Sequence, residues 1–286
     1  MKPLACYAHL ARNAVYALFY LISKFVRKQE ISVLMYHSVG SSDTFYSVTT
    51  REFYKQIDYL ISNYNVVSLK DLQDFVEGKR ELPRKAVVIT FDDGYLDNYE
   101  VAYPYLKKKN LPMTIFITTG YVSKKMLLGN KWLQMMSWTD ILDMDRNNVD
   151  IGAHTVNHPN LTKIDVSAAG KEILNSKIII EQKLGRKIQY FSYPFGAYNN
   201  CLMNLAKQSG FRGAVGGEGL IRRNEHAFSL NRVDVNRSIN FVMFKARLTL
   251  AINWYKKLEK IFKTSRNRMP LASIILELYR TLDLLD

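Results

Sequence analysis

The sequence predicts an α/β protein in which parallel strands, separated by helices, form a β/α barrel. Strand-like apolar runs alternate with helical patterns along most of the 286 residues, an order typical of a parallel sheet. Polar side chains follow directly after several of these runs, and reactive groups at the C-terminal ends of several strands are the layout of a barrel site. No Gly-x-Gly-x-x-Gly follows the first strand, which disfavours an open sheet that binds a dinucleotide.

The elements follow from apolar periodicity and from their start and stop signals. Predicted strands span 32–36, 65–67, 86–91, 113–117, 149–152, 189–192, 213–215 and 230–235. Predicted helices lie between them at 50–62, 69–77, 98–109, 138–146, 166–184 and 199–210. Ser137, with Asp140 three residues on, predicts a helix start, and Gly185 and Gly210 predict helix ends.

Two adjacent carboxylates end the strand at 86–91. The motif is Thr90-Phe91-Asp92-Asp93-Gly94, and neighbouring side chains on an extended chain point opposite ways, so the two aspartates should have different roles. Helix capping is the competing explanation. Capping explains one aspartate, but not a pair of carboxylates at the tip of a strand.

Two histidines follow the predicted strand at 149–152. His154 and His158 flank Thr155-Val156-Asn157, and Pro159 closes the segment. An exposed polar turn is the competing interpretation. Two imidazoles and a carboxylate are, however, what a divalent metal needs when it keeps an open position for water. Only two cysteines exist, Cys6 and Cys201, without metal-ligand spacing, so nitrogen and oxygen ligands are expected.

These motifs together resemble a known family. Thr90–Gly94 followed by His154-Thr155-x-x-His158 resembles the first two motifs of the polysaccharide deacetylases, the NodB-homology domain of carbohydrate esterase family 4. Segments 34–39 and 191–196 resemble a subgroup near the poly-N-acetylglucosamine deacetylases. The resemblance covers roughly residues 31 to 235. It implies a distorted (β/α)7 barrel that removes N-acetyl groups from an N-acetylated sugar, in a polysaccharide or a lipid-linked saccharide.

The resemblance also implies residue roles. The first aspartate of the family motif is the general base and the second binds metal, which corresponds to Asp92 and Asp93 here. His154 and His158 complete the metal triad. One divalent ion is expected, with zinc first and iron, cobalt or nickel as alternatives. Such an ion makes water more acidic and polarises the acetyl carbonyl.

The third motif of the family departs from its usual form. An Arg-x-Pro-Tyr segment, whose arginine steadies the base, corresponds here to Ser192, Pro194 and Phe195. The resemblance assigns an oxyanion donor to the backbone amide of Phe195. Tyr193 is grouped with Phe195 as an oxyanion or substrate contact.

The late Leu-x-His motif of the family, which supplies the acid, has no clear match. His37, at the tip of the first strand, is the candidate substitute as acid or substrate contact, and a structural histidine is the equal alternative. His226 lies in a polar loop and is expected to be solvated. The subgroup resemblance alone suggests that Arg232 orients Asp92.

The predicted organisation is an N-terminal amphipathic helix over 1–30, a catalytic domain over 31–240 and a basic amphipathic segment over 241–286. Leu18, Ile22 and Phe25 fall on the apolar side of the first helix, with Tyr16 and Tyr20 on the polar side. The apolar run at 14–22 lacks a cleavage site and is short for a membrane span.

Half of the net charge of +14 lies between residues 241 and 268. That segment has eight Lys or Arg and one acid, Glu259. No nucleic-acid motif accompanies this charge. A peripheral protein on the cytoplasmic face of an anionic membrane is therefore expected. The alternatives are a solvated basic helix face and an extracytoplasmic protein with an uncleaved N-terminal anchor.

Two rival functions stay open at the level of sequence. A catalytically silent sugar-binding homologue would explain the missing arginine and late histidine, although binding alone does not need Asp92. A non-haem iron enzyme also uses two histidines and one carboxylate, but its usual His-x-Asp pairing is absent.

Overall fold

The computed structural model describes residues 15–26, 28–40 and 43–264, with side chains to residue 259. The chain divides into two compact units. One unit spans Ile31–Ile239, and the other combines Met1–Glu30 with Asn240–Asp286. Residues 1–14 and 265–286, on which parts of the predicted terminal helices fall, lie outside the described residues.

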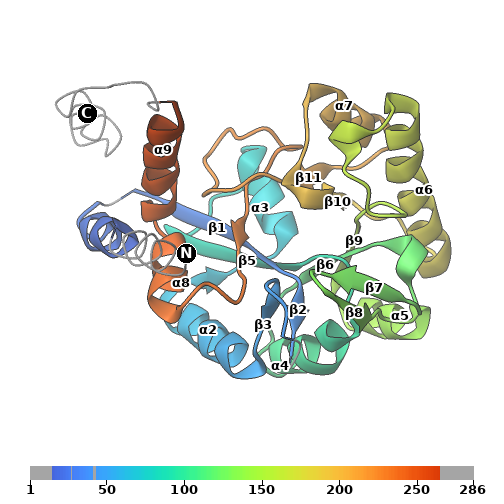
Figure 1. Ribbon diagram of the computed structural model, residues 1–286, viewed down its shortest axis with the longest axis horizontal. Coiled ribbons are helices and arrows are strands. Elements are labelled where there is room, and N and C mark those ends of the chain that lie inside the picture. Colours follow the sequence, from blue (N-terminus) through green and yellow to red (C-terminus); the bar gives the residue numbers. More distant parts are fainter. Residues whose placement is uncertain (1–14, 27, 41–42, 265–286) are drawn as a thin grey trace. The chain divides into compact units, whose positions relative to one another are not determined.

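The larger unit is built on a parallel sheet that curls into a barrel (Figure 1). Its strand order is β11-β10-β9-β6-β5-β1-β12, and β4 pairs with β5 off this path. The strands are β1 (Glu30–Tyr36), β4 (Asn65–Val66), β5 (Lys85–Phe91), β6 (Thr114–Ile117), β9 (Asp150–Ala153), β10 (Tyr190–Ser192), β11 (Gly213–Val215) and β12 (Val233–Asp234). All eight predicted strands are present, and the predicted distorted (β/α)7 barrel is confirmed.

The barrel is distorted because one short segment forms its closing strand. Val233 pairs with Leu34 of β1, while Leu230, three residues earlier, bridges to Val215 of β11. The segment 230–234 therefore reaches both edges of the curled sheet. Leu230 forms backbone hydrogen bonds with Ala214 and Gly216 on one side, and the Val235 amide donates to the Met35 carbonyl on the other.

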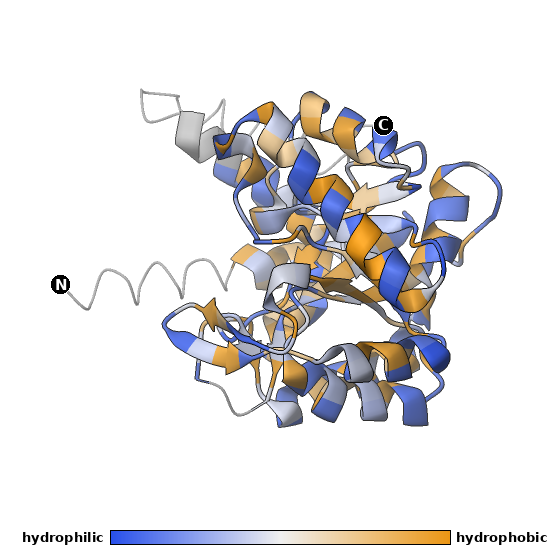
Figure 2. Ribbon diagram, turned by 90° about the vertical axis from the view of Figure 1, so that its right-hand side faces the viewer, coloured by the Kyte–Doolittle hydropathy of each residue, from blue (hydrophilic) through white to orange (hydrophobic). Residues whose placement is uncertain are grey.

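Helices surround the strands, which form the apolar centre of this unit (Figure 2). They are α2 (Thr50–Asn63), α3 (Leu69–Val76), α4 (Tyr103–Lys108), α5 (Trp138–Arg146), α6 (Val166–Leu184) and α7 (Asn200–Gln208). The predicted start at Ser137 is a capping box with Asp140, and Gly185 ends α6 with a φ of 68°. The predicted helix 98–109 instead begins as a π-helix, η1 (Asn98–Ala102), before α4.

Two small sheets were not predicted from the sequence. β2 (Ser38–Val39) pairs in parallel with β3 (Ser47–Val48), beyond the end of β1. β7 (Lys125–Leu128) and β8 (Lys131–Gln134) form an antiparallel hairpin. Gly129-Asn130 joins them, and a two-residue Gly-Asn loop between short strands is a recognised hairpin signal.

The smaller unit contains helical residues 15–23, α8 (Phe241–Arg247) and α9 (Ala251–Thr264). Tyr16 stacks on Tyr255 with ring centroids 4.3 Å apart, and Phe19 contacts Trp254 edge to face. The predicted polar face of the first helix, to which Tyr16 was assigned, therefore packs against α9. No helix among the described residues is long and apolar enough to cross a membrane.

Candidate active site

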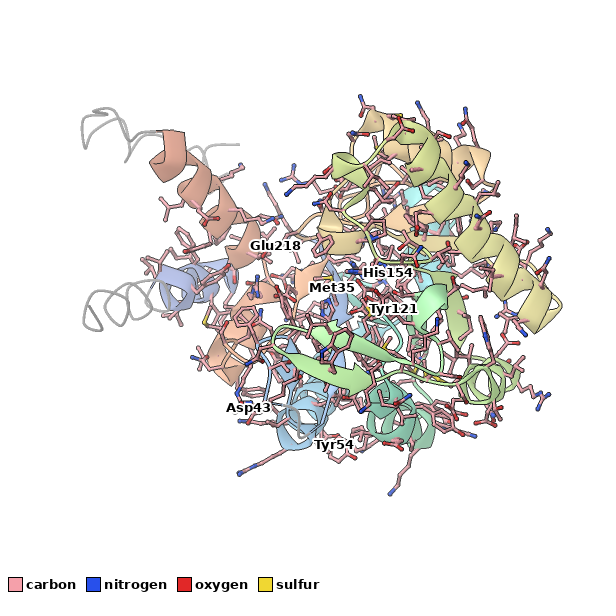
Figure 3. The ribbon with its side chains drawn as sticks, turned by 45° about the vertical axis from the view of Figure 1, so that its right-hand side comes forward. Met35, Asp43, Tyr54, Tyr121, His154 and Glu218 are labelled. Carbon is pink, nitrogen blue, oxygen red and sulfur yellow. The ribbon has the colours of Figure 1, made fainter. Side chains whose placement is uncertain are left out.

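The polar side chains expected from the sequence gather at the C-terminal ends of β5 and β9, the two strands on either side of β6. Asp92 and Asp93 follow β5, and His154 follows β9. Figure 3 labels His154 near the ends of the central strands, close to the loop that carries Tyr121. The backbone amide of His154 bonds to the Ile117 carbonyl of β6, so the histidine is fixed to the neighbouring strand.

Three of these side chains point their ligand atoms at one another. Nε2 of His154 and Nε2 of His158 lie 3.5 and 3.3 Å from Oδ1 of Asp93, and 3.2 Å from each other. One ligand atom from each residue falls within 4.8 Å of the others. Asp93 is 3% exposed and its Oδ1 has no hydrogen-bond partner. A buried, unpartnered carboxylate oxygen facing two imidazole nitrogens fits a divalent cation.

The state of His154 suits this arrangement. Its Nδ1 lies 2.7 Å from the carbonyl oxygen of Ser192, so Nδ1 carries the proton and the lone pair of Nε2 faces Asp93. Burial lowers the pKa of His154 to about 4, an effect that the nearby Asp92 charge only partly opposes. The imidazole is therefore neutral near pH 7, as a metal ligand must be.

The backbone that carries these ligands adopts left-handed conformations. The φ values are 71° at Asp93, 67° at Thr155 and 57° at His158, and none of these residues is glycine. Such conformations cost about 1–3 kcal/mol each and persist where the surroundings impose them. Thr155 Oγ1 accepts a hydrogen bond from the His158 amide at 3.0 Å. The local strain concentrates at the candidate metal site, as is typical of functional sites.

The second carboxylate, Asp92, is held by an arginine from the closing segment of the barrel. Arg232 donates from Nη1 to Oδ1 at 2.7 Å and from Nη2 to Oδ2 at 2.6 Å. Ser192 Oγ donates to Oδ2 at 3.1 Å and accepts from Arg232 Nη2 at 2.9 Å. Burial would raise the pKa of Asp92, but the charges of Arg232 and His154 outweigh it and hold the pKa well below its usual range.

Ser192 and Arg232 together occupy the place that the third family motif gives to one arginine. Ser192 stands at the position that the resemblance gives to the motif arginine, and Arg232 supplies the guanidinium, which contacts both carboxylate oxygens and Ser192 Oγ. Oδ2 of Asp92 lies 3.8 Å from His154 Nε2, so the oriented carboxylate is adjacent to the candidate metal site without being one of its three ligands.

His37 follows β1, and its charge is the smallest of the named contributions to the lowered pKa of Asp92. Its Nδ1 is buried without a hydrogen-bond partner, and its ring contacts that of Tyr46 at 5.4 Å. Asn98 Nδ2 donates to the His37 carbonyl at 2.7 Å. His226, in contrast, is exposed, and its Nδ1 accepts a hydrogen bond from the Phe228 amide at 3.3 Å.

Phe195 and Tyr193 differ sharply in position. Phe195 is 69% exposed and its ring lies 4.9 Å from that of His158, at the accessible side of the histidines. Tyr193 is fully buried, with its ring packed against Phe191 and Tyr198. The Tyr193 side chain is buried and therefore not accessible to a sugar in this structure. Its role as an oxyanion or substrate contact stays a prediction.

Comparisons with known proteins identify the family. The family model for polysaccharide deacetylase matches residues 79–214, a range that contains both aspartates and both histidines. The chain contains a polysaccharide deacetylase domain. Together with relatives that are named deacetylases, this makes it a carbohydrate deacetylase, and therefore a hydrolase.

Two relatives place this deacetylase more closely. YxkH of Bacillus subtilis is 29% identical over 219 residues, which are 76% of this chain and 75% of YxkH. The poly-beta-1,6-N-acetyl-D-glucosamine N-deacetylase of Staphylococcus epidermidis is 29% identical over 176 residues. That match covers 58% of this chain and 60% of the staphylococcal protein.

Solved structures agree with the sequence relatives. IcaB from Ammonifex degensii superposes with a TM-score of 0.70 at 27% identity, covering 78% of this chain and 98% of IcaB. A de-N-acetylase from Aggregatibacter actinomycetemcomitans gives a TM-score of 0.66 at 25% identity, covering 75% of this chain and 98% of that one.

Two contacts of this site had no signal in the sequence. The bond between Ser192 and Asp92 joins residues 100 positions apart, so no local pattern marks it. Glu172 of α6, which bonds to the loop between the two histidines, also has no motif signal. The Arg232 pair, which joins residues 140 apart, was suggested by the subgroup resemblance alone.

Proposed function

We propose that this deacetylase hydrolyses the N-acetyl group of an N-acetylated sugar, releasing acetate, and that the reaction depends on one divalent metal ion. The observation that carries the proposal is that the two adjacent carboxylates have different surroundings, one suited to binding a metal and the other to accepting a proton. Asp93 presents an unpartnered oxygen to two histidines, while Asp92 is fixed and ionised by Arg232. A protein that only binds sugar does not need an ionised carboxylate held in place beside the candidate metal site.

The residues that would hold the metal are Asp93, His154 and His158. Their donor set of two imidazoles and one carboxylate suits zinc, with iron, cobalt or nickel as alternatives. When bound, the cation supplies Lewis-acid chemistry that activates water and polarises an amide carbonyl.

The other residues have complementary roles in the proposed reaction. Asp92, ionised at neutral pH, accepts the proton of the attacking water. The backbone amide of Phe195 donates to the developing oxyanion. His37, whose Nδ1 has no hydrogen-bond partner in the protein, donates a proton to the departing amine. The exposed ring of Phe195 offers an apolar face to the sugar.

An N-acetylglucosamine polymer or a lipid-linked saccharide is the proposed substrate. The support comes from the staphylococcal relative, whose name specifies poly-beta-1,6-N-acetyl-D-glucosamine. A chain that covers 60% of that relative need not share its polymer. The substrate class is therefore assigned at the level of the N-acetylated amino sugar.

The test is acetate release from N-acetylated saccharides, both free and lipid-linked, by zinc-loaded protein. Zinc-loaded Asp92→Asn protein is the matched control, because it removes the proton acceptor and none of the three proposed ligands. Acetate from the wild type alone supports the proposal. No release by the zinc-loaded wild type, while it still retains the saccharide, would favour a silent sugar-binding homologue. Oxygen consumption during turnover would instead favour the iron enzyme.

We also propose that the smaller unit rests on an anionic membrane surface at the cytoplasmic face. Leu18, Leu21 and Phe25 are 56%, 55% and 88% exposed, three large apolar side chains at helical spacing. Lys24 and Lys28 lie beside them in the sequence, and basic residues are dense between 241 and 268. Apolar side chains flanked by cations suit a lipid surface, to which each nearby basic residue contributes roughly 1 kcal/mol.

Co-sedimentation with anionic and neutral vesicles tests this proposal. Wild-type protein should bind the anionic vesicles, less in high salt, and neutral vesicles poorly. Replacing Leu18, Leu21 and Phe25 with Ser should release it without loss of turnover on a soluble saccharide. Leu174→Ser with Ile178→Ser on α6, where both side chains are about equally exposed at 42% and 41%, is the control and should leave binding intact. Equal sedimentation of both variants would refute the lipid contact.

A further inference from the structure

The carboxylate of Glu172, on α6, bonds to the loop that joins the two histidines. Its Oε2 accepts from the amides of Val156 and Asn157, both at 2.9 Å. Its Oε1 accepts from Asn157 Nδ2 at 2.7 Å. Both oxygens of one side chain therefore bind a segment of two residues, which lies between His154 and His158 in the sequence.

The geometry of the loop explains why an anion fits there. Thr155 has a φ of 67°, and a residue in the left-handed conformation turns successive amides toward one side of the chain. Such a concavity of consecutive N–H groups binds anions, and hydrogen bonds from amides to a carboxylate are among the stronger ones. Glu172 supplies the anion from a regular helix of 19 residues, which gives the loop a rigid support.

Other backbone bonds to the loop come from Thr119 and Gly120. Thr119 donates from its amide to the Thr155 carbonyl at 3.2 Å, and Gly120 donates to the Val156 carbonyl at 2.8 Å. These bonds fix carbonyl groups. Glu172 binds the amides of the half-buried Val156 and the exposed Asn157. Without it, both donors would have to bond to water instead.

We propose that Glu172 is a positioning residue that holds the loop between His154 and His158 in the conformation that brings both imidazoles to Asp93. The role rests on the proposed metal site. His158, which is itself left-handed with a φ of 57°, depends on the loop more than His154 does, because the His154 amide is anchored to β6. Loss of the carboxylate should thus impair metal binding through His158 and leave Asp92 and Arg232 in place.

The first measurement is metal affinity, from competition between the protein and a chelating dye for zinc. Glu172→Ala should lower the affinity about 10- to 100-fold, the usual effect of losing a partner that orients a metal ligand. Alanine preserves the helix. Glu172→Gln should have a smaller effect, because its carbonyl oxygen can still accept both amides. Lys171→Ala, an exposed neighbour on the same helix, is the control and should bind zinc like the wild type.

The second measurement is hydrogen exchange of the metal-free proteins, which does not depend on activity or on zinc. The amides of Val156 and Asn157 should exchange faster in Glu172→Ala than in the wild type or Lys171→Ala, with α6 unchanged. Saturating zinc should restore most of the turnover of Glu172→Ala, since the defect lies in affinity.

The outcomes separate this role from the metal site itself. Wild-type zinc affinity in Glu172→Ala, or unchanged exchange at the two amides, would overturn the positioning role and leave the metal site standing. A wild-type protein that bound no zinc would refute the metal site and the positioning role together. A Glu172→Ala protein that lost stability but not zinc affinity would make Glu172 purely structural.

Discussion

Replacing Arg232 with Met should destabilise the protein far more than replacing an exposed arginine of the same region. Arg232 and Asp92 are 1% and 2% exposed and share two hydrogen bonds of 2.7 and 2.6 Å. Methionine fills part of the space but leaves the Asp92 carboxylate buried without its cation. Breaking a buried pair in this way costs about 3–5 kcal/mol, at least about a fifth of the 5–15 kcal/mol by which domains are typically stable.

Urea unfolding of the metal-free proteins at pH 7, followed by circular dichroism, measures this cost. Arg237→Met is the matched control, since Arg237 pairs with Asp43 while both side chains are exposed, and such pairs contribute about 0–1 kcal/mol. Adding Asp92→Asn to Arg232→Met should recover part of the loss, because the uncompensated charge is removed. A loss below about 1 kcal/mol for Arg232→Met, equal to that of Arg237→Met, would refute the reasoning.

Three further substitutions test separate parts of the account. Asp92→Asn should keep its zinc and lose most turnover, whereas zinc loss here and retention in Asp93→Asn would show that the two roles are reversed. His37→Ala should lower kcat with unchanged zinc content, and a wild-type rate would make His37 structural. Burial raises the pKa of Asp150 to about 6 from 3.8, so its carboxyl favours the folded state at low pH and loses that contribution as pH rises through 6. Asp150→Asn should therefore be nearly neutral at pH 3, below the unfolded pKa, and stabilising by up to about 3 kcal/mol at pH 8, and urea unfolding with a gain independent of pH would contradict this.

The sheet was predictable because its strands are buried on both faces and read as continuous apolar runs. β5, for example, is buried from Ala86 to Phe91. The change from apolar residues to Asp92 and Asp93 indicates where the strand ends. The β7–β8 hairpin was missed because its alternating pattern is short and mostly exposed, although its Gly129-Asn130 turn carried a usable signal.

The candidate metal triad was predictable for a different reason, since its residues sit in two compact motifs that each contain their own spacing. The environment of Asp92 was predictable only in part. The subgroup resemblance suggested Arg232, but no local pattern marks a pair of residues 140 positions apart, and only the folded barrel brings the two together. The same limit applies to Glu172, whose partners are backbone amides that no side-chain pattern can reveal.

The first helix shows where pattern reasoning misassigned a surface. Amphipathicity placed Tyr16 on the polar side of the helix and Leu18 with Phe25 on the apolar side. In the structure Tyr16 is 4% exposed against α9, while Phe25 is 88% exposed. A tyrosine ring can lie on a polar or an apolar face, depending on its partners. Here Tyr16 stacks on Tyr255, while Leu18 and Phe25 are exposed within the described residues.

The most direct test of the central claim is a zinc titration of metal-free protein in which bound zinc and acetate release are measured in the same samples. The account predicts that both rise together and saturate at one zinc per chain. It also predicts that Asp93→Ala, His154→Ala and His158→Ala each lower zinc content and turnover in parallel, because an incomplete ligand set binds weakly. Full zinc occupancy in all three variants, or full acetate release by metal-free wild-type protein, would contradict the account.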